Sequence, residues 1–277
     1  MFIVNQGSAT MKKKYAILPL LAMTVLSSCQ QSYGEEITDK ARVIELEKAI
    51  SDKMNEPKGF EVHVKASMSD DRGEGNKNAY SWDLIYRGDK KDNMYLAGTV
   101  EIEAAGDKAK YKYALYSVED PTYEKVCYIE MGSPDTAAKD IDVYAVRSDG
   151  YSSEGGLPGI LAYPIALYDE VRDPYYIDQA LIEYTGASPA KYYSKGDGSL
   201  TIERSSVEIW NGTRTSHTRM TYENYLLKDA VYESETTDET YKSSEKLELT
   251  YKTLFNYTVT LPSGWESLIR EPRGTYY

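Results

Sequence analysis

The stretch that decides the fold is FEVHVKASM, residues 60–68, in which apolar and polar side chains alternate without a break. Successive side chains of a β-strand point to opposite faces of a sheet, so a period of two predicts a strand with one buried and one solvated face. Phe60, Val62 and Val64 fall on the apolar side of this strand. We therefore expect them to contribute to the core.

Five more alternating segments follow within the next eighty or so residues, separated by short turn-like sequences. They are AYSWDLIYR (79–87), NMYLAGTVEIE (93–103), KYKYALYSVE (110–119), YEKVCYIEM (123–131) and DIDVYAVRS (140–148). Trp82, Leu84 and Leu96 occupy apolar positions in the first two of them. Six successive strands joined by short turns predict an antiparallel meander with one face buried and one face wet.

Alternation resumes in the last third of the chain. The segments are SLTIERSSVEIW (199–210), TSHTRMTYENYLL (215–227), DAVYESET (229–236) and KLELTYKTLFNYTVTLP (246–262). A single sheet of about ten strands does not stay flat, and it must curl or close.

Helical patterns stand before and between the two groups of strands. Thr38 and Asp39 can cap a helix that runs to Met54, with apolar residues at spacings of three and four. The apolar stretch 157–171 also fits a helical face, although Pro164 should kink it. A shorter helix should begin at Asp173 and end at Gly186. The expected fold is α+β and mainly β: a curled antiparallel sheet, or unclosed β-barrel, with an N-terminal helix and one or two helices covering its concave face.

The first thirty residues have the pattern of an export signal. Lys12, Lys13 and Lys14 precede twelve apolar residues (15–26), a run that suits a signal peptide and is shorter than the roughly 20 residues of a membrane-spanning helix. The sequence LSSC that ends at Cys29 resembles the bacterial lipobox. That resemblance implies removal of residues 1–28 and a lipid on the Cys29 thiol. Residues 1–10 add nothing that a signal needs, so we expect translation to start at Met11. The alternative is an ordinary secreted protein in which Cys29 merely follows the cleavage site.

A lipidated Cys29 would make this an extracytoplasmic protein, anchored to a bacterial cell membrane through a tether over residues 29–37. The chain from Cys29 onward has 29 basic and 44 acidic side chains, a formal charge of −15, which argues against nucleic acid as a partner. Once Cys29 is acylated, Cys127 has no partner for an internal disulfide. Its place within an alternating strand favours a buried structural thiol.

The sequence gives little support to catalysis, metal binding or a cofactor. Both histidines, His63 and His217, fall within strands and are expected to be solvated there. Two histidines without a free cysteine pair cannot form the usual zinc sites. Matches to S-x-x-K at Ser188 and Ser243 lack their companion motifs, and no phosphate-binding or zinc-protease motif is present. We therefore expect a protein that is not an enzyme and has neither a metal nor a cofactor.

The order of elements resembles the LolA-like superfamily, which includes the periplasmic lipoprotein carrier and the LppX/LprG lipoproteins. The resemblance covers residues 38–277 as one domain, together with the closing LFNYTVTLPSGW (254–265). It implies a half-open barrel whose apolar cavity holds a lipid or another hydrophobic molecule. The residues expected to line that cavity are Phe60, Val62, Val64, Trp82, Leu84, Leu96, Ile160, Leu161 and Leu167.

Two alternatives to ligand binding stay open. The same apolar residues could simply fill a core without any cavity. The chain also contains 27 tyrosines against three phenylalanines and three tryptophans. Tyrosine favours strands and presents a polar tip. A structural or interaction lipoprotein, binding a polymer or a protein through a tyrosine-rich sheet, is therefore the second hypothesis.

Overall fold

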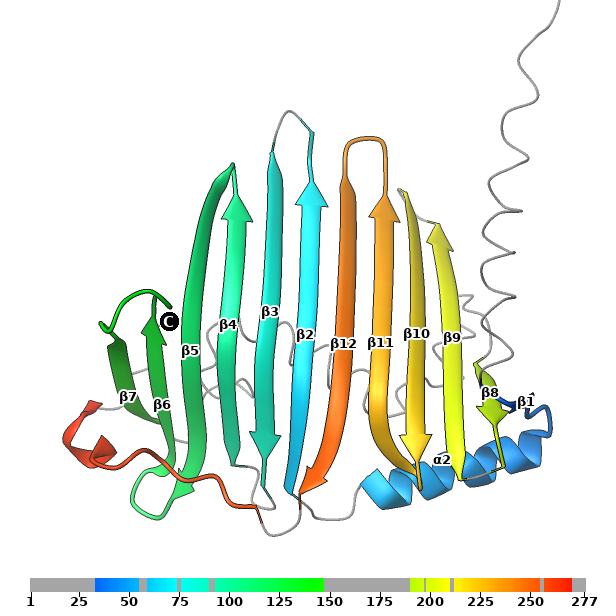
Figure 1. Ribbon diagram of the computed structural model, residues 1–277, viewed down its shortest axis with the longest axis horizontal. Coiled ribbons are helices and arrows are strands. Elements are labelled where there is room, and N and C mark those ends of the chain that lie inside the picture. Colours follow the sequence, from blue (N-terminus) through cyan, green and yellow to red (C-terminus); the bar gives the residue numbers. More distant parts are fainter. Residues whose placement is uncertain are drawn as a thin grey trace, which may run out of the picture.

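The computed structural model describes residues 33–54, 59–73, 76–89, 93–146, 190–196, 198–209, 212–254 and 257–270. Within these residues, thirteen strands form one large sheet that is accompanied by one α-helix (Figure 1). No helix among them is long and apolar enough to cross a bilayer. The prediction of a mainly β fold is confirmed.

The strands follow the predicted segments closely. Their bounds are β1 (Glu35–Glu36), β2 (Gly59–Asp71), β3 (Lys77–Gly88), β4 (Met94–Ala104), β5 (Asp107–Asp120), β6 (Glu124–Gly132), β7 (Asp140–Val146), β8 (Lys191–Ser194), β9 (Ser199–Ile209), β10 (Thr213–Glu223), β11 (Leu226–Thr237), β12 (Lys242–Leu254) and β13 (Ile269–Arg270).

Two antiparallel meanders meet in the middle of the sheet. The order is β1-β8-β9-β10-β11-β12-β2-β3-β4-β5-β6-β7-β13, so β2 and β12 join the halves although about 180 residues separate them in the sequence. The end strands β1 and β13 each pair with a single neighbour, so the sheet is unclosed, as predicted. Pairing is antiparallel throughout except between β13 and β7, which are parallel.

The helix α2 (Lys40–Met54) confirms the predicted N-terminal helix. Asp39 caps it, because its carboxylate accepts a hydrogen bond from the Ala41 N–H at 3.0 Å. Leu46 and Ile50 are buried, four residues apart on the face that joins the main core. The helices expected over residues 157–186, which include Ile160, Leu161 and Leu167, lie outside the described residues. Cys29 and the signal sequence lie outside them as well.

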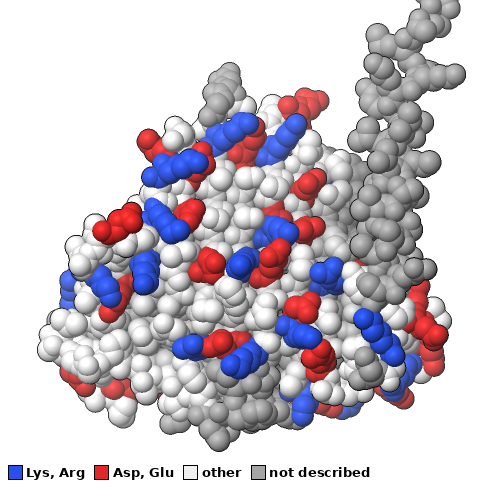
Figure 2. Space-filling view, in the orientation of Figure 1, with Lys and Arg blue, Asp and Glu red and all other residues white. Residues whose placement is uncertain are grey.

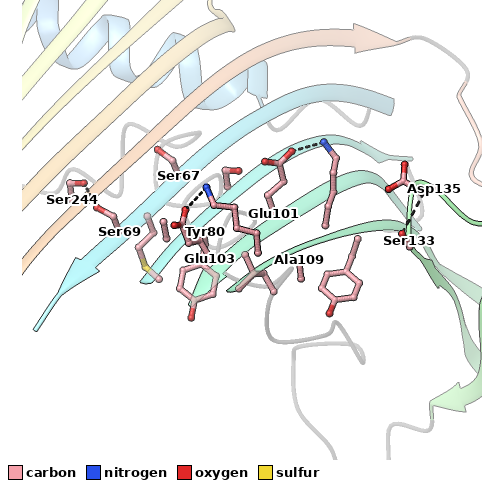
Figure 3. A pocket seen from close by; sticks show the side chains of 16 residues that line it. Ser67, Ser69, Tyr80, Glu101, Glu103, Ala109, Ser133, Asp135 and Ser244 are labelled. Atoms are coloured by element: carbon pink, nitrogen blue, oxygen red, sulfur yellow. Dashed lines mark hydrogen bonds and ion pairs between the residues drawn. The ribbon is translucent and has the colours of Figure 1, made fainter. Parts of the chain in front are cut away.

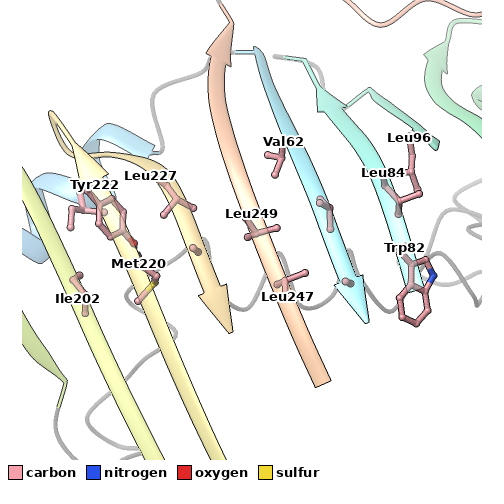
Figure 4. Packing of buried hydrophobic residues seen from close by; sticks show 14 of the residues in the cluster. Val62, Trp82, Leu84, Leu96, Ile202, Met220, Tyr222, Leu227, Leu247 and Leu249 are labelled. Carbon is pink, nitrogen blue, oxygen red and sulfur yellow. Dashed lines mark hydrogen bonds between the residues drawn. The ribbon is translucent and has the colours of Figure 1, made fainter. Parts of the chain in front are cut away.

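The main core covers one face of the sheet, which we call the inner face (Figure 4). Cross-strand register aligns its residues in rows, such as Leu84, Val64 and Leu249 on β3, β2 and β12. All three are at most 2% exposed. Full burial of one such side chain contributes about 1.5–3 kcal/mol. The prediction that the even-numbered residues of 60–68 face the core is correct.

The C-terminal segment, residues 257–270, crosses the opposite side of the sheet, the outer face, at its β5–β7 end (Figure 1). A second, smaller core of Val126, Tyr128 and Val143 lies there, with Leu261 and Trp265 packed against it. The segment is tied to the β3–β4 loop, where the Val259 N–H donates to the buried Asp89 carboxylate at 3.0 Å.

Two expectations about strand boundaries were wrong. Residues 246–262 were predicted as one strand, but β12 ends at Leu254 and residues 257–262 belong to no strand. Residues 215–227 were predicted as one strand, but Asn224 and Tyr225 have positive φ angles of 50° and 63° and form a two-residue hairpin turn between β10 and β11. Within the predicted tether 29–37, Glu35 and Glu36 form a short strand, β1, that the alternation of side chains did not predict. It pairs with β8, which was not predicted either.

Candidate functional site

The inner face brings together all six of the described residues that were predicted to line a cavity. They lie on the adjacent strands β2, β3 and β4. Val62, Val64, Leu84 and Leu96 are fully buried and Trp82 is 4% exposed, so these five belong to the core. Phe60 is half-buried and lies against the rings of Tyr86 and Tyr251. The surface they form is continuous and apolar.

In the β9–β12 half of the sheet, the side chains of the inner face change from apolar to polar along the strands. Near helix α2 its rows are apolar, with Ile202, Met220 and Ala230 side by side on β9, β10 and β11. One residue pair further along, Arg204 lies beside Thr218. Beyond them the same face carries polar side chains from four strands. We call this group the inner polar patch; it consists of Arg204, Ser206, Arg214, Ser216, Tyr232, Ser234 and Glu245.

Arg214 is held firmly within the inner polar patch. Its guanidinium donates to the Tyr232 hydroxyl at 3.1 Å and the Ser234 hydroxyl at 3.3 Å, and it lies 3.6 Å from the Glu245 carboxylate. These partners outweigh the cost of partial burial, and the pKa of Arg214 is raised. This arginine is already neutralised by the chain itself.

Arg204 has a different environment. It is partly buried and makes no hydrogen bond or ion pair within the described part of the chain. Burial lowers the pKa of its guanidinium, and the more distant charge of Glu208 only partly opposes that effect. A partly dehydrated guanidinium with unused donors is a ready partner for a carboxylate or phosphate group. Among the described residues of the inner face, Arg204 is therefore a cation without a hydrogen bond or ion pair to another described residue.

The outer face is covered by charged side chains of both signs (Figure 2). Many form cross-strand ion pairs, including Lys110 with Glu101 at 2.5 Å and Lys108 with Glu103 at 3.1 Å. Exposed pairs of this kind contribute little to stability, typically below about 1 kcal/mol each. They keep this side of the sheet in water.

A shallow hollow of about 760 Å³ lies on the outer face over β2–β5 (Figure 3). The small side chains of Ser67, Ser69 and Ser81 form its floor, and Glu101 and Lys110 form one wall. Two adjoining hollows of about 410 and 510 Å³ share residues with it and extend it across the sheet. The result is a polar groove whose lining carries both signs of charge with a small excess of acidic side chains, and which offers no apolar enclosure.

A row of tyrosines crosses the outer face beside the C-terminal segment. Tyr95, Tyr116 and Tyr128 are register neighbours on β4, β5 and β6, with ring centroids 4.7 and 5.8 Å apart. Arg87 lies over the Tyr95 ring and also over the ring of Tyr257, 5.4 and 5.7 Å from their centroids. The row is half-buried or buried, so it packs the second core and is not an open tyrosine surface.

Burial, reinforced by a hydrogen bond from its hydroxyl to Glu130, raises the pKa of Tyr128 from 10.0 to about 12. A raised folded-state pKa means that protonated Tyr128 stabilises the fold fully below pH 10, and that this stabilisation is lost as the pH rises towards 12. The pKa values of Tyr113, Tyr116 and Tyr192 are raised by burial as well. We therefore expect an alkaline titration followed by phenolate absorbance to show a late phase that loses part of its amplitude in Tyr128→Phe. Tyr225→Phe, at an exposed turn, is the control. A late phase of unchanged amplitude in Tyr128→Phe would contradict the assignment.

The two histidines and Cys127 contact neighbouring strands of the sheet. The His63 Nε2 lies 2.6 Å from the Asp83 carboxylate on the neighbouring strand, and the His217 Nδ1 lies 3.1 Å from the Ser205 hydroxyl. Cys127 is fully buried, as predicted, and burial raises the pKa of its thiol. Among the described residues, no three His, Cys, Asp or Glu side chains are grouped to hold a metal ion.

Sequence reasoning missed the inner polar patch. One signal was present: in ERSSVE (203–208), the positions that share a face with Ile202 are Arg204, Ser206 and Glu208. A strand that begins with a core residue and continues with polar residues on the same face indicates a core that stops partway. No protein-family model and no curated protein matches this chain.

Proposed function

We propose that this chain is a membrane-anchored bacterial lipoprotein that binds a lipid or another hydrophobic ligand in the cell envelope, on the inner face of its sheet. The observation that carries the proposal is the amphipathic inner face. Apolar rows through Ile202 and Met220 lead directly to Arg204, whose donors have no partner among the described residues. In the proposed complex the apolar part of an amphiphile joins these fully buried rows, and its anionic head group pairs with Arg204.

The energetics favour an amphiphile over a small polar ligand. Each buried methylene of an acyl chain contributes about 0.8 kcal/mol, so a chain of ordinary length outweighs the cost of ordering it. A guanidinium that is partly dehydrated before binding loses less solvation when it pairs with a head group. Arg214 is the weaker partner, because two of its nitrogens already donate to Ser234 and Tyr232 and the Glu245 carboxylate lies 3.6 Å from it.

The anchoring half of the proposal rests on the lipobox-like LSSC and the apolar run before it. A lipid on Cys29 would hold the domain at a membrane surface, where an amphiphile can enter or leave without crossing much water. Stable anchoring by lipid requires two or more acyl chains, which a diacylglyceryl group on the thiol supplies.

The test is native mass spectrometry of Cys29→Ser protein secreted from a bacterium. We expect a bound species of lipid mass, and Arg204→Gln should lower its occupancy several-fold because the head group loses its partner. Lys65→Gln, which removes an exposed outer-face cation, should leave occupancy unchanged. Protein that is always empty, or equal loss in both variants, would refute the proposal.

A second function is favoured by the outer-face groove. Its floor of serine hydroxyls and its walls of paired charges suit a neutral polar polymer. Binding of a polysaccharide or an extended peptide that is abolished by Ser67→Trp, with lipid occupancy unaffected, would support an interaction lipoprotein instead.

A further inference from the structure

The described chain begins on the outer face, at the β1–β8 edge of the sheet. The Tyr33 hydroxyl accepts a hydrogen bond from the Arg219 guanidinium at 2.9 Å, and its ring centroid lies 6.0 Å from that of Tyr193. Glu35 and Glu36 then pair with β8. The Ile37 N–H donates to the Tyr192 carbonyl oxygen at 2.7 Å. The chain is therefore attached to this edge from Tyr33 onward.

The position of Tyr33 limits how far the sheet edge can be from a lipid on Cys29. Three residues lie between Cys29 and Tyr33, and the four residue steps from one to the other span at most about 14 Å when fully extended. The width of the sheet is much larger: thirteen strands spaced about 4.8 Å apart extend over about 58 Å when laid flat. A lipid on Cys29 consequently brings the β1–β8 edge close to the bilayer, whereas the β7–β13 edge can be far from it.

The same edge exposes two apolar side chains and an unpaired stretch of backbone. Strand β8 pairs with β9 only as far as Glu203, so Arg204–Ile209 of β9 pair with β10 alone among the described strands. Val207 is 57% exposed and Ile209 is 77% exposed, both on the outer side of β9. Unpaired backbone groups need water or head-group partners, so this edge can rest at the head-group level without entering the hydrocarbon.

We propose that the β1–β8–β9 edge of the sheet faces the lipid bilayer, with Val207 and Ile209 touching the interfacial region and the β7–β13 edge directed away from it. The inference rests on the proposed lipidation of Cys29. Shallow burial of two aliphatic side chains gives only a weak affinity for a membrane. It can still fix the orientation of the domain when a lipid anchor already holds the side chains at the membrane surface.

The balance of charge at this edge points to zwitterionic head groups. The exposed acids Glu35 and Glu36 lie close to the exposed cations Lys191 and Lys195. The edge therefore neither requires nor strongly repels anionic lipid. Phosphatidylcholine vesicles are the appropriate probe.

The experiment measures the distance of three positions from the bilayer. Single substitutions Ile209→Cys, Ser67→Cys and Glu266→Cys are introduced into the full chain, labelled with a fluorescent maleimide, and reconstituted as lipidated protein in phosphatidylcholine vesicles that contain a head-group quencher. Ser67 lies on the middle of the outer face and Glu266 near the far edge. Cys127 is buried, and unsubstituted protein measures any residual labelling.

We expect quenching at Ile209→Cys to exceed that at both other positions several-fold. Equal quenching at Ile209→Cys and Ser67→Cys would mean that the outer face lies on the membrane, and it would overturn the proposal. Energy transfer between differently labelled Ile209→Cys copies, with no lipid quenching, would mean that a second copy pairs with β9, and it would also overturn it.

The Cys29→Ser version of each labelled protein separates the two proposals. If the mass of the wild-type protein shows no lipid, or Cys29→Ser stays bound to the vesicles, the proposed anchoring fails. If the wild-type protein carries lipid and binds but Ile209→Cys is not quenched, only the orientation fails. Val207→Ser combined with Lys195→Cys labelling should reduce quenching at the edge without releasing the protein.

Discussion

Replacement of Gly98 by alanine is expected to destabilise the sheet severely, by about 3 kcal/mol or more. Gly98 lies in the middle of β4 with a φ angle of 153°, opposite Leu84 on β3 and Tyr113 on β5. A Cβ atom at this position would lie 2.0 Å from the Asp83 carbonyl oxygen and 2.8 Å from the Leu84 Cα. Both atoms belong to the backbone of a central strand, so neither can move without breaking the β3–β4 pairing.

Gly106→Ala is the matched control for this experiment. Gly106 also has a positive φ, 87°, but no atom lies within 4 Å of its would-be Cβ. Gly106→Ala should lower the free energy of unfolding by only about 1–2 kcal/mol, which is the cost of placing a residue with a Cβ at a positive φ angle. Urea unfolding of Cys29→Ser protein, followed by circular dichroism, compares the two variants. A similar midpoint for both would show that the close approach of β3 and β4 at Gly98 is not a constraint.

The second large effect is expected from Asp89→Ala, which should cost about 2–4 kcal/mol. Asp89 is 7% exposed. Its carboxylate accepts hydrogen bonds from the Asn93 N–H and side-chain amide, at 3.1 and 3.0 Å, and from the Val259 N–H at 3.0 Å. Alanine would leave these donors buried and unpaired, and the C-terminal segment would lose its attachment to the β3–β4 loop.

Asp89→Asn serves as the control, since it keeps the shape and one acceptor oxygen and should be less destabilising. Besides lowering the unfolding midpoint, Asp89→Ala should accelerate proteolysis within residues 257–270, because that segment packs on the outer face through Leu261 and Trp265. If Asp89→Ala unfolds at the wild-type midpoint with the segment still protected, the carboxylate is not what holds it.

Much of the secondary structure could be predicted from the sequence, because strand alternation and helix capping are local. The meander from β2 to β7 and the helix α2, capped by Asp39, follow from side-chain period alone. The errors arose where local signals are weak. The turn at Asn224 and Tyr225 lacks glycine, and the two-residue strand β1 has no period to detect.

The candidate site was only half predictable. Alternation identified Val62, Val64 and Leu84 as members of one apolar face, and they lie together. It could not show that Arg204, Arg214 and Glu245, from three different strands, would share a polar end of that face. Their association depends on which strands pair and in which register, and register is set by the whole sheet.

The sequence by itself determined a mainly β domain, which residues of each strand share a face, and a signal-like start ending at Cys29. The tertiary structure decided that β12 pairs with β2 and that Arg204 has no partner in the described structure while Arg214 has three. It also decided that Tyr33 is held at the β1–β8 edge. The physical reason is sequence separation. The period of side chains along a strand is set within a few residues, whereas these contacts join residues from 18 to 195 positions apart.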